Sequence, residues 1–137
     1  MTDALIIDAI RTPIGRRNGA LAGVRAEELA AQVLNGLVSR HDLEPGEIDC
    51  IILATLSAQA EFPGTSFFLQ SLLGTPEIPC FDLRAQCSGF VYGLSVADAW
   101  IRIGMYRRIL VVGAEVQSSA LDVSSRGRDT AVIFGDG

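Results

Sequence analysis

Cysteine is the residue type in this sequence best suited to covalent chemistry, and one of its three cysteines stands out by its surroundings. Cys87 lies in the segment CFDLRAQCSGF, between an apolar run that predicts a buried strand over residues 78–83 and a helical pattern that ends near Met105. A thiol at a helix start faces unpaired backbone N–H groups, whose partial positive charge favours the thiolate. The small residues Ser88 and Gly89 leave the sulfur open. We therefore predict a nucleophile at Cys87; the alternative is a small buried hydrophobe, as most free cysteines are.

The helix after Cys87 must hold the sulfur in place. Its apolar residues recur at helical spacing and predict a helix anchored in the core through Phe90, Val91, Leu94, Ala97 and Ile101.

The other two cysteines, Cys50 and Cys80, belong to apolar runs in which a thiol stays neutral. Gaps of thirty and seven residues separate the three cysteines, which fits neither a disulfide framework nor a zinc site. No CxxC motif is present, so thiol redox chemistry and metal binding are not favoured. We expect reduced thiols and no bound metal or cofactor.

Composition excludes several classes of protein. A chain of 137 residues with 49% hydrophobic residues fits one domain with its own core. The net charge of −5 argues against nucleic-acid binding. No apolar run has the length of a membrane span, and residues 1–5 do not resemble a signal peptide, so we expect a cytoplasmic protein without membrane contact.

Strands and helices are expected to alternate along the chain. The pattern predicts an α/β domain with a mostly parallel five-stranded sheet in the order β-α-β-α-β-α-β-β, with helices on both faces and the fifth strand at an edge. The predicted strands cover residues 4–10, 48–56, 78–83, 108–112 and 130–134, and the predicted helices cover residues 25–40, 64–73 and 87–105. Residues 113–128 form a long polar connection.

Several polar residues are assigned ordinary structural roles. The arginines of the loop RTPIGRRNG are expected to face water. His41, the only histidine, follows Arg40 at the end of the first helix and suits the negative end of the helix dipole. Asp136, between two glycines, is interpreted as a turn residue.

Three segments, DLRAQCSGF, ILVVGAEV and RDTAVIFGDG, resemble the N-terminal half of the 3-oxoacyl-acyl-carrier-protein synthase III branch of the thiolase superfamily. The opening DAIRTPIGRRNGALAGVRAEELAA is instead similar to the start of a thiolase. The nucleophile motif favours the synthase branch, because thiolases usually carry Cys-Gly-Ser where this chain has Cys-Ser-Gly-Phe. The resemblance covers almost all of residues 1–137 and implies an N-terminal thiolase-like half-domain without its C-terminal half.

The resemblance assigns roles to four residues. Cys87 matches the nucleophile that accepts an acyl group from a CoA thioester, and its own backbone N–H matches an oxyanion donor. Phe62 matches an aromatic residue that crosses the dimer interface to the partner's acyl pocket, and Phe134 matches a residue lining that pocket. Arg128 matches an arginine that holds the adenine end of CoA. By residue type alone, Phe62 could equally be a core aromatic residue, and for Phe134 a core position in the fifth strand is the favoured interpretation.

The implied reaction is a decarboxylative Claisen condensation of the acyl group with malonyl-ACP, in fatty acid or polyketide synthesis. The implied assembly is a homodimer in which residues 78–83 pair with their own copy. The family's catalytic His and Asn come from a second half-domain, and no spacing links His41 to Cys87. Residues 1–137 are thus expected to carry the nucleophile without the rest of the active site, and to expose an apolar helix face.

Three departures from the family pattern leave the identity of the acyl donor and the length of the acyl chain open. Gln86 precedes the nucleophile where a small residue is usual, and Gln117 stands where an apolar pocket residue is common. The tryptophan that sandwiches adenine in many synthases is missing, and Trp100 lies in a different element.

Two alternatives to the synthase interpretation stay open. One is a thiolase or another acyltransferase relative. The other is a non-catalytic half used for binding or dimerisation, in which Cys87 performs no chemistry.

Overall fold

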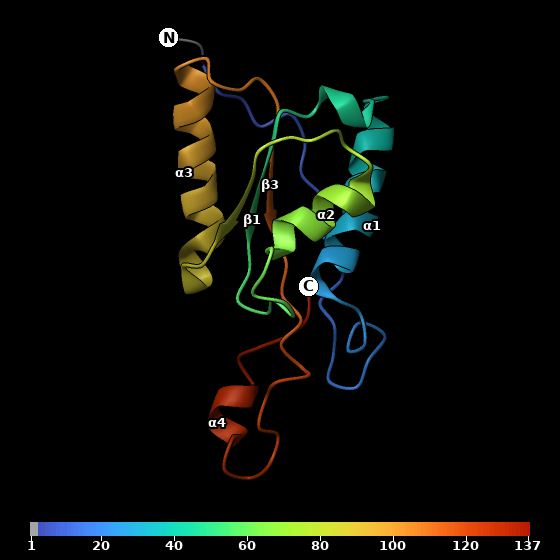
Figure 1. Cartoon of the computed structure of the whole chain (residues 1–137). Helices are drawn as coiled ribbons and strands as arrows, with labels where there is room; N and C mark the ends of the chain where they lie inside the picture. The colour runs from blue at the N-terminus through green and yellow to red at the C-terminus, as the bar shows by residue number, and fades with distance from the viewer. Residues whose placement is uncertain (1–2) are drawn as a thin grey trace.

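A three-stranded parallel sheet is the centre of the fold (Figure 1). The computed structural model describes residues 3–137. Strand β1 (Cys50–Ala54) lies between β2 (Cys80–Leu83) and β3 (Ile109–Gly113), with Ile51 opposite Cys80 and Leu110. All five residues of β1 are buried, because strands flank both of its edges and helices cover both faces.

Helices cover both faces of the sheet. Helices α1 (Ala26–Arg40) and α2 (Thr65–Leu73) pack together on one side, and α3 (Gly89–Arg102) lies on the other, as Figure 1 shows. A fourth helix, α4 (Arg128–Ala131), lies beyond the carboxyl ends of the strands. The predicted α/β class, parallel sheet and two helical layers are therefore confirmed.

Two short 3₁₀ turns join these elements. The first, η1 (Pro45–Glu47), connects α1 to β1, and the second, η2 (Gln86–Ser88), connects β2 to α3. Helix α2 ends at Gly74, which has φ 67°, as the sequence predicted. No helix within residues 3–137 has both the length and the apolarity needed to cross a membrane.

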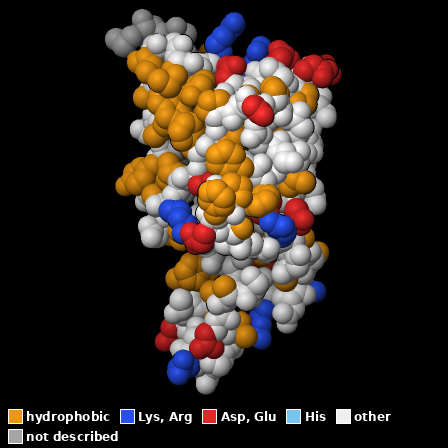
Figure 2. All heavy atoms as spheres, in the orientation of Figure 1, with side chains coloured by type: hydrophobic (Ala, Val, Ile, Leu, Met, Phe, Trp, Pro, Cys, Tyr) orange, Lys and Arg blue, Asp and Glu red, His pale blue; other side chains and the backbone are white. Residues whose placement is uncertain are grey.

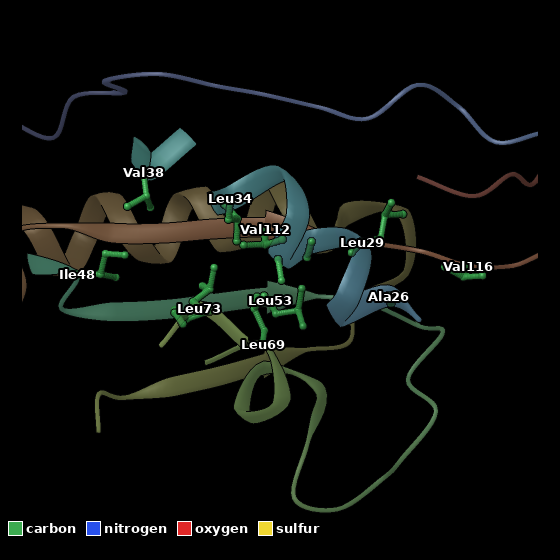
Figure 3. Packing of buried hydrophobic residues seen from close by; sticks show 14 residues of the cluster. Ala26, Leu29, Leu34, Val38, Ile48, Leu53, Leu69, Leu73, Val112 and Val116 are labelled. Atoms are coloured by element: carbon green, nitrogen blue, oxygen red, sulfur yellow. The ribbon is translucent and has the colours of Figure 1, made fainter. Parts of the chain in front are cut away.

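The core divides into two clusters because side chains alternate along β1. Ile51 and Leu53 pack with α1 and α2 in the larger cluster, whereas Cys50 and Ile52 pack against α3. Figure 3 shows the larger cluster, in which Leu34 and Leu69 of the helices lie around the side chains of the strands.

Helix α3 contacts the sheet through its smallest residues. Its buried positions are Gly89, Gly93 and Ala97, one on each successive turn. A β-carbon on Gly93 would lie 3.1 Å from Val111 Cγ1, so the helix axis could not approach as closely with a larger residue.

The prediction that Phe90, Val91, Leu94, Ala97 and Ile101 anchor α3 in the core was wrong for every residue except Ala97, which is buried. Phe90 is 45% exposed and Val91 is 62% exposed, while Leu94 and Ile101 are only partly buried. The apolar pattern surrounds the helix, and the glycine and alanine stripe occupies the face toward the sheet. Figure 2 shows hydrophobic side chains gathered on the side of the molecule where α3 lies, which confirms the expected exposed apolar face.

The predicted first and fifth strands are absent within residues 3–137, so the prediction of five strands was wrong. Residues 4–10 are extended but pair with no strand, and Leu5, Ile6 and Ile7 are each more than 70% exposed. Residues 130–134 form the end of α4 and a turn, because backbone pairing begins only at Asp136, in isolated bridges to Gly15 and Val116. A strand-like sequence pattern needs a hydrogen-bonding neighbour before it becomes a strand.

The close contact between α3 and the sheet generates a stability prediction. Gly93→Leu should lower the free energy of unfolding by about 1–3 kcal/mol, because the added side chain would enter the space of Val111 and Ile52. The matched control is Gly36→Leu in α1, where an added β-carbon meets only Ile10 Cδ1 at 4.0 Å. That control should be neutral or raise stability by up to about 1 kcal/mol, because leucine is a better helix former than glycine. Urea unfolding of both variants checks this, and equal losses would contradict it.

Candidate functional site

Cys87 lies in the turn that carries the chain from β2 into α3. It is the middle residue of η2, it is exposed, and it precedes the first residue of α3 by two positions. Gln86 has φ 46°, a left-handed conformation that non-glycine residues seldom adopt, and this turns the backbone sharply just before the sulfur. Buried Gly89 fixes the start of α3, since a β-carbon there would lie 3.0 Å from Ala54 Cβ.

The hydrogen-bonding groups around Cys87 are only partly used. No acceptor within residues 3–137 takes a hydrogen bond from its backbone N–H. The neighbouring Ser88 N–H is used within the turn, where it donates to the Ala85 carbonyl at 3.0 Å. Cys87 therefore presents both a thiol and an uncommitted donor to solvent.

Cys50 and Cys80 are less exposed than Cys87. Cys50 is fully buried, and burial, with smaller effects of Cys80 and Asp49, raises the pKa of its thiol to about 11. Burial, with a smaller effect of Asp82, raises the pKa of Cys80 to about 11 as well. The expectation of neutral thiols in the strands is confirmed.

Phe62 lies in the loop between β1 and α2 and is 89% exposed, so it is not a core aromatic residue. The loop is tied to the chain near Cys87, because Arg84 Nη1 lies 3.2 Å from Glu61 Oε1. Asp82 of β2 holds the start of α2 by accepting hydrogen bonds from Ser66, at 3.1 Å from the N–H and 2.8 Å from Oγ. These contacts place Phe62 beside the outer edge of β2.

Arg128 and Phe134, to which the family resemblance assigns roles, line one cavity of about 440 Å³. Two of its lining residues, Arg128 and Ala131, belong to α4, which lies beyond the carboxyl ends of the strands in Figure 1, where ligands of parallel α/β proteins usually bind. Neither Cys87 nor Phe62 lines the cavity, but Arg17 of the N-terminal loop does. Arg17 is exposed, as expected for the arginines of this loop, and it also lines the cavity.

Asp136 is a buried anchor, and the interpretation as a turn residue was wrong. It is 1% exposed, its carboxylate accepts hydrogen bonds from Ser118 N–H at 2.9 Å and Ser118 Oγ at 2.6 Å, and its carbonyl accepts from Gly15 N–H at 2.7 Å. The contact joins the first and last parts of the chain, so local sequence could not have revealed it.

Glu115 is a site residue that the sequence analysis missed. Its carboxylate accepts hydrogen bonds from the N–H of Leu56 at 2.7 Å and from the N–H and Oγ of Ser57 at 3.1 and 2.7 Å. Its backbone exchanges two hydrogen bonds of 2.8 Å with Gly137. An acid directly after an apolar strand was the available signal, because that position falls at the carboxyl edge of the sheet.

The two glutamines that depart from the family pattern have defined places. Gln117 donates to Glu115 Oε2 at 2.8 Å and does not line the cavity, while Gln86 forms the turn before the nucleophile. Trp100 packs between Phe81 and Tyr106, with ring centroids 4.9 and 5.5 Å away, so it does not replace the missing tryptophan.

His41 lies away from the site and caps the end of α1, as expected. Its Nε2 lies 2.8 Å from Asp8 Oδ2, and Arg40 Nη1 lies 2.9 Å from the same oxygen. Hydrogen bonds from His41, the Ala9 N–H and Arg40 lower the pKa of Asp8 to about 2. Within residues 3–137 no group of three or more His, Cys, Asp or Glu side chains could hold a metal ion.

Comparisons with known proteins agree with this geometry. Residues 81–137 match the family model described as 3-Oxoacyl-[acyl-carrier-protein (ACP)] synthase III. A beta-ketoacyl-[acyl-carrier-protein] synthase III of Streptococcus suis is 42% identical over 127 residues, which are 93% of this chain and 38% of that protein.

Solved structures show the same relationship. The crystal structure of a 3-oxoacyl-[acyl-carrier-protein] synthase III from Aquifex aeolicus is 40% identical, with a TM-score of 0.75 over 81% of this chain and 35% of that one. An acetyl-CoA acetyltransferase of Bacillus anthracis is 30% identical, with a TM-score of 0.72 over 85% of this chain and 31% of that one. The chain spans about a third of the length of these relatives. Sequence, family model and fold together show that this chain is similar to part of the 3-oxoacyl-[acyl-carrier-protein] synthases III.

Proposed function

We propose that this chain is the part of a condensing enzyme that carries the acyl group, with Cys87 as the acceptor. The observation that supports this most directly is the contrast among the three thiols: Cys87 is exposed at the carboxyl edge of the sheet, whereas burial raises the pKa of Cys50 and Cys80. The substrate is a CoA thioester, and the reaction uses no bound metal or cofactor.

Acyl transfer follows from the position of the sulfur. The Cys87 thiolate attacks the thioester carbonyl, the carbon–sulfur bond to CoA breaks, and CoA leaves as a thiolate that takes up a proton. The uncommitted backbone N–H of Cys87 donates to the carbonyl oxygen while it carries negative charge. The product is an acyl-enzyme at Cys87.

Carbon–carbon bond formation completes the reaction. Malonyl-ACP loses CO₂, the resulting enolate attacks the acyl carbonyl, and the Cys87 thiolate leaves as the 3-oxoacyl-ACP is formed. The enolate oxygen needs hydrogen-bond donors, which we assign to a His and an Asn outside residues 1–137 because His41 is paired with Asp8. The product belongs to fatty acid or polyketide synthesis. Three free thiols are typical of a reducing compartment, so we place the reaction in the cytoplasm.

The remaining site residues bind substrate. We assign Arg128 to the adenine end of CoA, since a guanidinium can stack on a purine while it hydrogen-bonds a phosphate. We assign Phe134 to the apolar lining that receives the substrate, because it is part of the same cavity as Arg128. Phe62, 89% exposed, is assigned to the acyl pocket of a second copy.

The proposed assembly is a homodimer. Strand β2 is an edge strand, with β1 on one side and no strand on the other within residues 3–137. An open edge can pair with its own copy across a two-fold axis, which would carry Phe62 toward the partner.

A thiolase activity is the second candidate. The acetyl-CoA acetyltransferase match and the thiolase-like opening of the sequence favour it. The two activities share acylated Cys87 and differ in the second substrate, which is malonyl-ACP in a synthase and a second acetyl-CoA in a thiolase. If the chain is instead a non-catalytic half-domain used for binding or dimerisation, Cys87 should not become acylated.

The contrast among the thiols predicts selective alkylation. Iodoacetamide at about pH 8 should label Cys87 first, because a thiol with a pKa of about 11 is only about one part in a thousand thiolate at that pH. Labelling of Cys50 and Cys80 should rise only as the pH approaches 11. Peptide mapping measures all three sites, with Cys87→Ser as the control, and earlier labelling of Cys50 would contradict the assignment.

If the active site is divided between two half-domains, residues 1–137 alone should accept an acyl group but form no carbon–carbon bond. After exposure to acetyl-CoA, intact-mass measurement should find at most one acetyl group, on Cys87, and none in Cys87→Ala. Residues 1–137 alone should turn malonyl-ACP into no 3-oxoacyl product, and addition of the polypeptide that bears the His and Asn should restore condensation. Product formed at an ordinary enzymatic rate by these residues alone would overturn the assignment of roles.

The open edge of β2 predicts self-association of the catalytic protein. Light scattering at high micromolar concentration should give the mass of a dimer. A monomer under these conditions would count against pairing of β2 with its copy.

A further inference from the structure

The cavity that contains Arg128 is built from both ends of the chain. One wall comes from the N-terminal loop through Gly15 and Arg17, and the other comes from residues 118–135. Its volume of about 440 Å³ falls within the range of about 300–1,000 Å³ that is usual for small-molecule sites. The lining combines apolar side chains, such as Leu121 and Phe134, with serine hydroxyl groups and two arginines.

Backbone geometry directs Arg17 to the cavity. Arg17 is the second residue of a turn in which Gly19 N–H donates to the Arg16 carbonyl at 2.9 Å, and Asn18 has φ 53°. A β-carbon on Gly19 would lie 2.7 Å from the Arg16 carbonyl oxygen, so glycine is required there. The hydrogen bond from Gly15 to Asp136 holds the base of this turn against the opposite wall.

Both arginines of the cavity are free to bind an anion. Most arginines of the chain pair with a carboxylate, but neither Arg17 nor Arg128 forms an ion pair anywhere in the stretch from residue 3 to residue 137. The cavity lining also contains no Asp or Glu. Two unpaired guanidinium groups beside apolar and hydroxyl groups suit a ligand that has phosphates joined to a less polar part.

We propose that Arg17 binds a phosphate group of the CoA thioester in this cavity, opposite Arg128, so that donor recognition depends on the N-terminal loop. The inference rests on the proposed function, because it names a further binding residue for the same substrate. It also gives a physical reason why the chain can bind CoA without a tryptophan to stack on adenine: a second positive charge on the phosphates replaces the stacking contact.

Equilibrium binding of CoA to the intact protein tests the proposal by calorimetry. Arg17→Ala should weaken CoA binding by about tenfold or more, because a hydrogen bond to a charged group is lost. Arg17→Lys should recover part of the affinity through its charge. The matched control is Arg16→Ala, which removes the neighbouring exposed arginine that does not line the cavity and should leave the affinity unchanged.

The outcomes separate this inference from the proposed chemistry. Unchanged CoA affinity in Arg17→Ala, an equal loss in Arg16→Ala, or no CoA binding by the parent protein would overturn the role of Arg17. Arg17-dependent CoA binding without acylation of Cys87 would support the inference and overturn the proposed reaction. Thermal unfolding of each variant checks the fold, and a loss of affinity with an unchanged midpoint supports a direct contact.

Discussion

The contact between α3 and the sheet sets the position of Cys87, and it depends on residues that have almost no side chain. Gly89 and Gly93 allow the helix to approach β1 and β3 so closely that an added β-carbon would lie within about 3 Å of Ala54 and Val111. The larger apolar residues of α3 are displaced to its other faces, where Phe90 and Val91 are exposed. Exposed apolar residues on a helix are typical of a face that further structure covers, in agreement with relatives that are longer than this chain.

Carboxylates fix the loops around the nucleophile. Glu115 holds the loop after β1, Asp82 holds the start of α2, and Asp136 holds the segment after β3, each by accepting hydrogen bonds from a backbone N–H and a serine hydroxyl. Hydrogen bonds to an ionised acceptor are stronger than neutral ones, so a few acids can order long connections. In this part of the molecule the acidic residues order the loops near Cys87, the proposed nucleophile.

The sequence predicted those features that depend on local pattern. The apolar run of β1, the capping glycine Gly74 and the strand-to-helix junction at Cys87 each carry their own signal within a few residues. Residues 4–10 have an equally strong strand pattern, but a pattern does not supply the neighbour that a strand requires. The apolar run of α3 could not show which face meets the sheet, although the spacing of Gly89, Gly93 and Ala97 was the available signal. The anchor at Asp136 and the inclusion of Arg17 in the cavity join residues about 120 positions apart, beyond the reach of local pattern.

The pairing of Gly15 with Asp136 means that the cavity requires both parts of the chain, since one wall comes from residues 15–17 and the other from residues 118–135. A ligand held between the two walls can bind only the closed form and therefore stabilises that closure by mass action. In the described part of the chain, the Gly15–Asp136 hydrogen bond is the one backbone hydrogen bond between the N-terminal loop and residues 118–137, so the closed form depends on it when no ligand is bound. A ligand of this cavity would then also protect this part of the chain from proteases.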